Sequence, residues 1–290
     1  MTEAPASDVL YQALIHELTK ALGLLRVKGG RAIATALFGK VARRVSEMGI
    51  GVNRVVAESG QAAAANWLLP NFVAGHEARG AENIPAAGPL VIASNHPAAV
   101  DSLVISAHMT RPDYKIIIGH NVFFESLPNV VEKNIMAPPP ENLAGRMHVV
   151  RECLRHLESG GTLLIFPRGA IEPDPDSMPN ADGEFHLWSR SLDIFLQRVP
   201  ETRVLVTIVS GVIHPAYIHH PLTYIRRDRA NRQRLAFLLQ MTRQVLAGRE
   251  MFGLRPRVTF GELVHASGGQ ARSQVRQAAG RVLSEHMSWR

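Results

Sequence analysis

From about residue 70 onward, short apolar runs alternate with longer stretches in which apolar positions recur at helical spacing. The runs with the length of strands are 71–79, 90–93, 114–118, 134–137, 162–166, 203–209 and 257–260. The predicted helices between them are 98–109, 142–159, 184–198 and 228–247, with a closing helix over 270–287. Strands that are apolar throughout indicate a sheet covered on both faces. The pattern therefore predicts an α/β fold with a mixed, largely buried sheet flanked by helices.

The chain before the first strand is helical in pattern, over 8–25, 31–48 and 52–65. We therefore divide the protein into an N-terminal amphipathic helical region, residues 1–66, and an α/β domain, residues 67–290. The apolar residues of the second helix fall in one arc: Ile33, Leu37, Phe38, Val41, Val45 and Met48. Seven basic residues and no acidic one lie between Lys20 and Arg44. Such a helix can lie on an anionic membrane or pack its apolar arc on the domain, and the sequence leaves both open.

The formal net charge of +7 and the pI of about 10.1 point to an anionic partner. A second basic region runs from Arg226 to Arg257 and contains nine arginines but only two acidic residues, Asp228 and Glu250. A surface of this kind attracts the phosphates of nucleic acids, nucleotide cofactors or lipid head groups. Aromatic residues, which stack on bases, make up only 6% of the chain. We therefore expect no nucleic-acid partner.

The 290 residues, 46% of them hydrophobic, are enough to bury a substantial core. The only cysteine, Cys153, excludes an internal disulfide and is expected to be a packing residue in a reducing compartment. Residues 1–30 lack the order of a secretory signal, and the uncharged run 83–100 is interrupted by prolines. We expect a soluble or peripheral protein.

The candidate chemistry is centred on His96. The apolar run 90–93 stops at Ser94-Asn95-His96-Pro97, and a helix follows, so His96 lies at the carboxyl end of a strand. Asp101 falls near the first turn of that helix. Open α/β sheets place their chemistry at such junctions, so the two residues can meet as a base and its orienting partner. The same spacing joins His108 to Asp113, but across the break at Pro112.

A second candidate segment follows the strand 162–166, at Pro167-Arg168-Gly169. Free N–H groups of a glycine-containing loop can hold an anion or an oxyanion, and Arg168 adds a fixed positive charge. The alternative is an ordinary turn with an exposed arginine. Two proline-rich loops, 138–140 and 172–180, also follow strands and are expected to border the same face.

No metal site is expected. His214, His219 and His220 are close together in the sequence, but no cysteine or carboxylate accompanies them at ligand spacing. We interpret them as part of a polar loop near the active face.

Three blocks together resemble the glycerolipid acyltransferase family, which includes the lysophosphatidate and glycerol-3-phosphate acyltransferases. They are GAENIPAAGPLVIASNHPAAVDSL (80–103), TLLIFPRGAIEP (162–173) and VLVTIVSGVIHP (204–215), within a resemblance that covers roughly 70–215. The resemblance implies transfer of a fatty acyl group from an acyl-CoA or acyl-carrier-protein thioester to a lyso-lipid hydroxyl. It implies no further cofactor, and a cytoplasmic enzyme bound peripherally to the inner face of an anionic membrane.

Carried over to this sequence, the resemblance makes His96 the general base and Asp101 the residue that orients its imidazole. Asn95, Arg168 and Gly169 are assigned to the oxyanion or the acceptor. The sequence departs from the family in two blocks. Family members usually have F-P-E-G-T-R-S where Phe166-Pro167-Arg168-Gly169-Ala170-Ile171-Glu172 stands here, and an arginine near 134–140, where this chain has none. These departures leave a second hypothesis, a catalytically weakened lipid-binding or membrane-tethering protein on the same fold.

Overall fold

The computed structural model describes residues 7–139, 141–189, 191–265 and 271–289. The strands are β1 (Glu77–Arg79), β2 (Leu90–Ser94), β3 (Tyr114–Gly119), β4 (Ile135–Ala137), β5 (Thr162–Ile165), β6 (Arg203–Ser210) and β7 (Arg257–Val264). In the described residues they form one seven-stranded sheet in the order β1-β7-β6-β2-β5-β3-β4. Neighbouring strands are parallel except β6 and β7, which are antiparallel. The predicted mixed sheet is confirmed.

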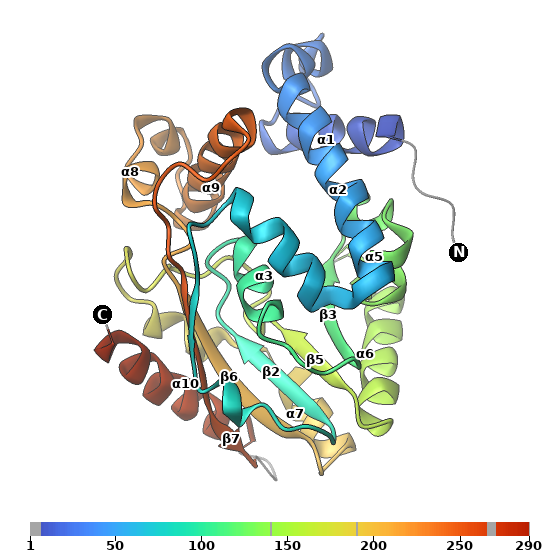
Figure 1. The fold of residues 1–290 in the computed structure, drawn as a ribbon, viewed down its shortest axis with the longest axis vertical. Coiled ribbons are helices and arrows are strands. Elements are labelled where there is room, and N and C mark those ends of the chain that lie inside the picture. The colour runs from blue at the N-terminus through green and yellow to red at the C-terminus, as the bar shows by residue number, and fades with distance from the viewer. Residues whose placement is uncertain (1–6, 140, 190, 266–270, 290) are drawn as a thin grey trace.

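Helices cover both faces of this sheet and form the N-terminal region (Figure 1). The α-helices are α1 (Ser7–Ala21), α2 (Gly30–Leu68), α3 (Val100–Ser106), α4 (Val122–Glu125), α5 (Pro128–Glu132), α6 (Leu143–Glu158), α7 (Ser191–Arg198), α8 (Pro215–Ile218), α9 (Arg229–Ala247) and α10 (Ala271–Ser288). The 3₁₀ turns are η1 (Leu69–Asn71), η2 (Ala81–Asn83), η3 (Asp182–Leu187) and η4 (Pro221–Ile225).

The strand residues alternate between two apolar cores. In β2, Leu90 and Ile92 join the core under α2, α3 and α9, whereas Val91 and Ala93 join the core under α6, α7 and α10. All five β2 side chains are buried, because the sheet is covered on both faces. Cys153 of α6 is fully buried in the second core, as a packing residue would be, and burial raises the pKa of its thiol to about 12.

The two helices predicted at 31–48 and 52–65 are one helix, α2, and the predicted break between them is wrong. Gly49 and Gly51 lie inside the helix, where two aromatic rings leave no space for a side chain. A Cβ on Gly49 would lie 2.7 Å from the Phe123 ring, and a Cβ on Gly51 would collide with the Trp67 ring. The real break is at Gly60, whose φ of 84° is left-handed. There α2 bends back across the domain (Figure 1).

Other element boundaries also differ from prediction. The strand predicted from residue 71 begins only at Glu77, since η1 occupies Leu69–Asn71 around Pro70. The helix predicted over 184–198 is split into η3 and α7, with Trp188 extended between them. The short helices α4, α5 and α8 were not predicted. Pro140, Arg190 and Gln270, which belong to predicted segments, lie outside the described residues.

The apolar arc of α2 has two environments. Val41 is buried, and Val45 and Met48 pack on the core under α3 and α9, so this part of the helix docks on the domain. Ile33 and Leu37, earlier in the same arc, are 44% and 66% exposed. Within the described ranges, every helix is too short or too polar to cross a bilayer.

Candidate active site

The end of β2 is fixed to its neighbour by Asn95. Its side-chain amide donates to the Val209 carbonyl (2.9 Å) and its side-chain oxygen accepts from the Val209 N–H (2.8 Å), so it continues the pairing of β2 with β6. The residue is 2% exposed. Asn95 therefore sets where His96 leaves the sheet, and both polar atoms of its side chain are engaged in doing so.

His96 and Asp101 meet as the sequence predicts. The chain turns at Pro97 into α3, which brings the Asp101 Oδ2 atom to 2.9 Å from the His96 Nδ1 atom. Asp101 is fully buried and also accepts the N–H groups of Ala98 (3.0 Å) and Ser102 (2.6 Å). Three donors around one buried carboxylate fix its orientation. The His96 side chain remains 26% exposed.

The surroundings of the imidazole make it a stronger base. Burial alone lowers the pKa of His96, but the charge and hydrogen bond of Asp101, helped by Glu172, outweigh burial and an opposing effect of Arg234, so the pKa is raised. The ring stacks on Phe166 at the end of β5, with centroids 4.2 Å apart. Because Nδ1 donates to Asp101, Nε2 carries the free lone pair.

Glu172 is a site residue that the sequence analysis missed. Its Oε2 atom accepts the His96 backbone N–H (3.0 Å), its Oε1 atom accepts the Trp188 indole N–H (2.9 Å), and its own N–H donates to the His96 carbonyl (2.9 Å). The residue is 1% exposed, and burial raises its pKa to about 7. The only signal in the sequence was a carboxylate, before Pro173, in the loop after a candidate strand.

Helix α9 also contacts the site, and nothing in the sequence predicted this contact. The buried Gln233 amide donates to the carbonyls of Pro97 (2.8 Å) and Glu172 (2.7 Å), joining the two loops that carry the site. Asp174 extends this link by accepting the N–H groups of Gly211 and Val212, both at 2.9 Å, after β6. The expected position of the 172–180 loop beside His96 is thereby confirmed.

Arg168 and Gly169 lie in the loop that follows β5, and both already have hydrogen-bond partners within the protein. The Arg168 Nε atom donates to Glu184 (2.8 Å), and Glu184 also pairs with Arg229 (3.0 Å), so one carboxylate is shared by two guanidinium groups. Gly169 has a left-handed φ of 65°, and its N–H donates to the Phe166 carbonyl (2.9 Å). The N–H of Gly169 is therefore already hydrogen-bonded within the turn and is not available to an oxyanion.

The other candidates do not join the site. His108 contacts His76 (3.0 Å between ring nitrogens), and Asp113 pairs with Arg111, so the second His-x-x-x-x-Asp match does not meet. His214 and His220 accept backbone N–H groups as caps of α8 and η4. In the part of the chain that the structure describes, no three His, Cys, Asp or Glu side chains gather as a metal site would require.

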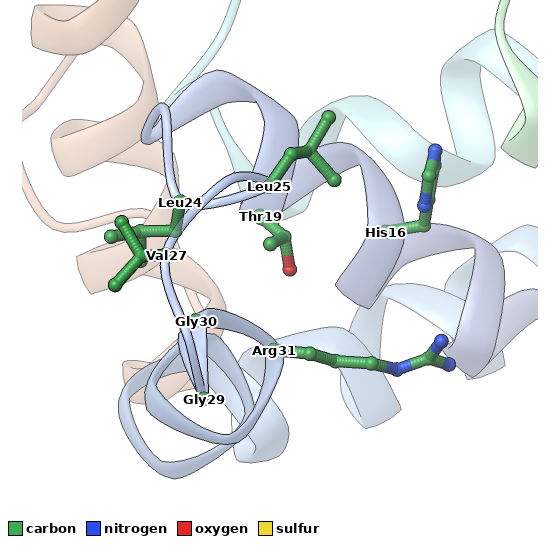
Figure 2. Close-up of a pocket in the computed structure, with 8 residues that line it drawn as sticks. All are labelled: His16, Thr19, Leu24, Leu25, Val27, Gly29, Gly30 and Arg31. Carbon is green, nitrogen blue, oxygen red and sulfur yellow. The ribbon is translucent and has the colours of Figure 1, made fainter.

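Two hollows in the surface lie away from His96. One, of about 250 Å³, sits in the turn between α1 and α2 (Figure 2). Its lining is His16, Thr19, Leu24, Leu25, Val27, Gly29, Gly30 and Arg31. The other, of about 900 Å³, lies between β1, β7 and α10. Neither is lined by His96 or Asp101.

Comparison with known proteins identifies an acyltransferase segment. Residues 76–219 match the family model described as Acyltransferase, and this segment contains His96, Asp101, Arg168 and Glu172. The comparison with curated proteins finds no match. A solved structure, the 1-acyl-sn-glycerophosphate (LPA) acyltransferase PlsC from Thermotoga maritima, is 14% identical, with a TM-score of 0.46, over 96% of this chain and 98% of that one. Residues 76–219 are therefore an acyltransferase segment that surrounds a histidine–aspartate pair, and the chain is an acyltransferase.

Proposed function

We propose that this acyltransferase moves a fatty acyl group from a CoA or acyl-carrier-protein thioester to the hydroxyl of a lyso-lipid or related lipid. The contact of 2.9 Å between His96 and the fully buried Asp101 carries the proposal. A thioester is already activated, so the enzyme has to supply a deprotonated alcohol and a place for the tetrahedral oxyanion. A partly exposed imidazole with a free Nε2 lone pair can supply the deprotonated alcohol.

In the proposed reaction, the His96 Nε2 atom takes the proton of the acceptor hydroxyl as its oxygen attacks the thioester carbonyl. Asp101 holds the ring and stabilises the imidazolium that forms. When the tetrahedral intermediate collapses, the C–S bond breaks and the imidazolium returns the proton to the departing thiolate. An ester and a free thiol result, and no covalent acyl-enzyme is needed.

We assign the oxyanion to the loop around Gly169. Because the Gly169 N–H is held by Phe166, the donor has to come from a later residue of that loop. Arg168 follows Phe166, whose ring stacks on His96, by two residues, and it shares Glu184 with Arg229. We propose that Arg168 contacts an anionic head group of the acceptor.

The reaction is tested with a long-chain acyl-CoA and a panel of lyso-lipids, reading both thiol release and product mass. We expect a diacyl product with at least one acceptor, formed together with an equal amount of thiol. Thiol release without any lipid product would contradict acyl transfer to these acceptors. A carrier-protein thioester run in parallel distinguishes a wrong donor from an absent reaction.

Replacing Glu172 with glutamine should move the pH dependence of the reaction. The charge of Glu172 helps to raise the pKa of His96, so its loss should shift the rising limb of kcat/KM to lower pH. The measurement is kcat/KM against pH for the wild type and the variant. Glu158, an exposed glutamate of α6, provides the control Glu158→Gln, which should leave the limb in place. An unmoved limb in Glu172→Gln would refute the electrostatic role of Glu172.

We further propose that the N-terminal helices bring the enzyme to an anionic membrane. Leu37 is 66% exposed on a helix that carries Arg31, Lys40, Arg43 and Arg44. Changing it to aspartate should weaken binding to anionic vesicles by about tenfold, because an apolar contact is lost and a like charge is added. Flotation with phosphatidylglycerol vesicles measures the effect. Unchanged flotation would count against this surface.

A further inference from the structure

A second exposed apolar group lies in η4, far from the N-terminal helices in sequence. Three of its five residues expose large side chains: Leu222 by 51%, Tyr224 by 58% and Ile225 by 69%. Single exposed apolar residues are common on soluble proteins, but three in one turn are not explained by chance exposure alone. We call Leu222, Tyr224 and Ile225 the η4 patch.

Internal hydrogen bonds fix the conformation of the turn that displays this patch. Thr223, between the exposed residues, is fully buried, and its hydroxyl donates to the His220 carbonyl (2.7 Å). His220 in turn accepts the N–H of Leu222 through its ring (3.3 Å). The apolar side chains are therefore held outward by internal hydrogen bonds of the turn and are not a frayed end.

The η4 patch follows β6, whose carboxyl end lies beside the strand end that carries the active site. β2 and β6 are parallel, so their carboxyl ends share one edge; His96 follows β2, and α8 and η4 follow β6. Helix α9 begins four residues after the patch, and its Gln233 contacts the loops of His96 and Glu172. Figure 1 shows α8, α9, α1 and the start of α2 at the same end of the molecule, with α7 toward the other.

The charge around the patch selects the kind of partner. Five arginines and one aspartate lie between residues 221 and 234, and Arg227, two residues after Ile225, is exposed. Arg232 lies over the Tyr224 ring, 5.6 Å from its centroid. Apolar side chains flanked by arginines suit the boundary between acyl chains and anionic head groups, where tyrosine is also favoured.

From this arrangement we propose that the η4 patch is a second membrane contact, which inserts into the surface of an anionic bilayer beside the active site. The inference deepens the proposed function, since a lipid acceptor has to reach His96 from the bilayer. Together with the N-terminal helices it gives two contacts from distant parts of the chain, which fix the orientation of the site toward the lipid.

The test is flotation of the full chain with vesicles of phosphatidylglycerol and phosphatidylcholine in equal amounts, and with phosphatidylcholine alone. Ile225→Ser should weaken binding to the anionic vesicles about tenfold. The matched control is Ile194→Ser on α7, an isoleucine that is 40% exposed, and it should bind like the wild type. Arg227→Glu should reduce the preference for anionic vesicles without affecting the fold.

Equal binding by Ile225→Ser and the wild type would overturn the proposal, as would an equal loss in Ile194→Ser. A change in the sedimentation of Ile225→Ser with vesicle binding intact would show instead that the patch joins two copies of the chain. Vesicle binding needs no turnover, so His96→Ala should float like the wild type. Failure of the acyl-transfer reaction and failure of the membrane contact are therefore seen separately.

Discussion

Replacing His96 with alanine should reduce acyl transfer by about 10²- to 10⁴-fold, because the base that takes the hydroxyl proton is removed. The side chain is partly exposed and its ring contacts are with Asp101 and Phe166, so the fold should survive. The measurement is kcat/KM for lipid product, with thermal unfolding of both proteins as a check.

His108 offers a matched control, since it stands in the same spacing to an aspartate but contacts His76 instead. We expect His108→Ala to stay within a few-fold of the wild type. If His96→Ala kept a tenth or more of the wild-type activity, His96 would not be the base.

Changing Asp101 to asparagine should cost about 10²- to 10³-fold in kcat and also destabilise the protein. The negative charge that raises the pKa of His96 is lost. In either orientation of the new amide, its NH₂ group faces a backbone N–H, of Ala98 or of Ser102, that the carboxylate now accepts. A buried N–H without its acceptor costs about 1–3 kcal/mol.

The control for this variant is Asp113→Asn, at the second match to the spacing. Asp113 pairs with Arg111 and lies outside the site, so its activity per folded molecule should not change. The two variants are compared by kcat and by the free energy of unfolding. A fully active Asp101→Asn protein would show that the pair at 2.9 Å is structural only.

The strands were predictable because burial on both faces makes them continuous apolar runs. β2, β5 and β6 were found within one or two residues of their ends for this reason. The path of α2 was not predictable, because Gly49 and Gly51 look like helix breakers along the sequence. Only the rings of Phe123 and Trp67, brought close in three dimensions, explain why glycine is needed there. Gly60 is the glycine that breaks the helix, yet nothing near it in the sequence distinguishes it from Gly49 and Gly51.

The same distinction holds at the candidate site. His96 and Asp101 could be paired from the sequence because both belong to one strand–turn–helix unit, five residues apart. Glu172 and Gln233 reach the site from a distant loop and from α9, and nothing near them in the sequence marks that contact. Asn95 was assigned to substrate, yet its side chain binds the backbone of Val209. Contacts set by tertiary packing leave no local pattern.

The most direct test of His96 as the base is the dependence of kcat/KM on pH. A general base acts in its neutral form, and the pKa of His96 is raised above its ordinary value of 6.5. Activity should therefore be lost as the pH falls through a pKa above 6.5, and the limb should be absent from the residual rate of His96→Ala. A flat profile between about pH 6 and 8, or the same limb in the variant, would contradict proton transfer to His96.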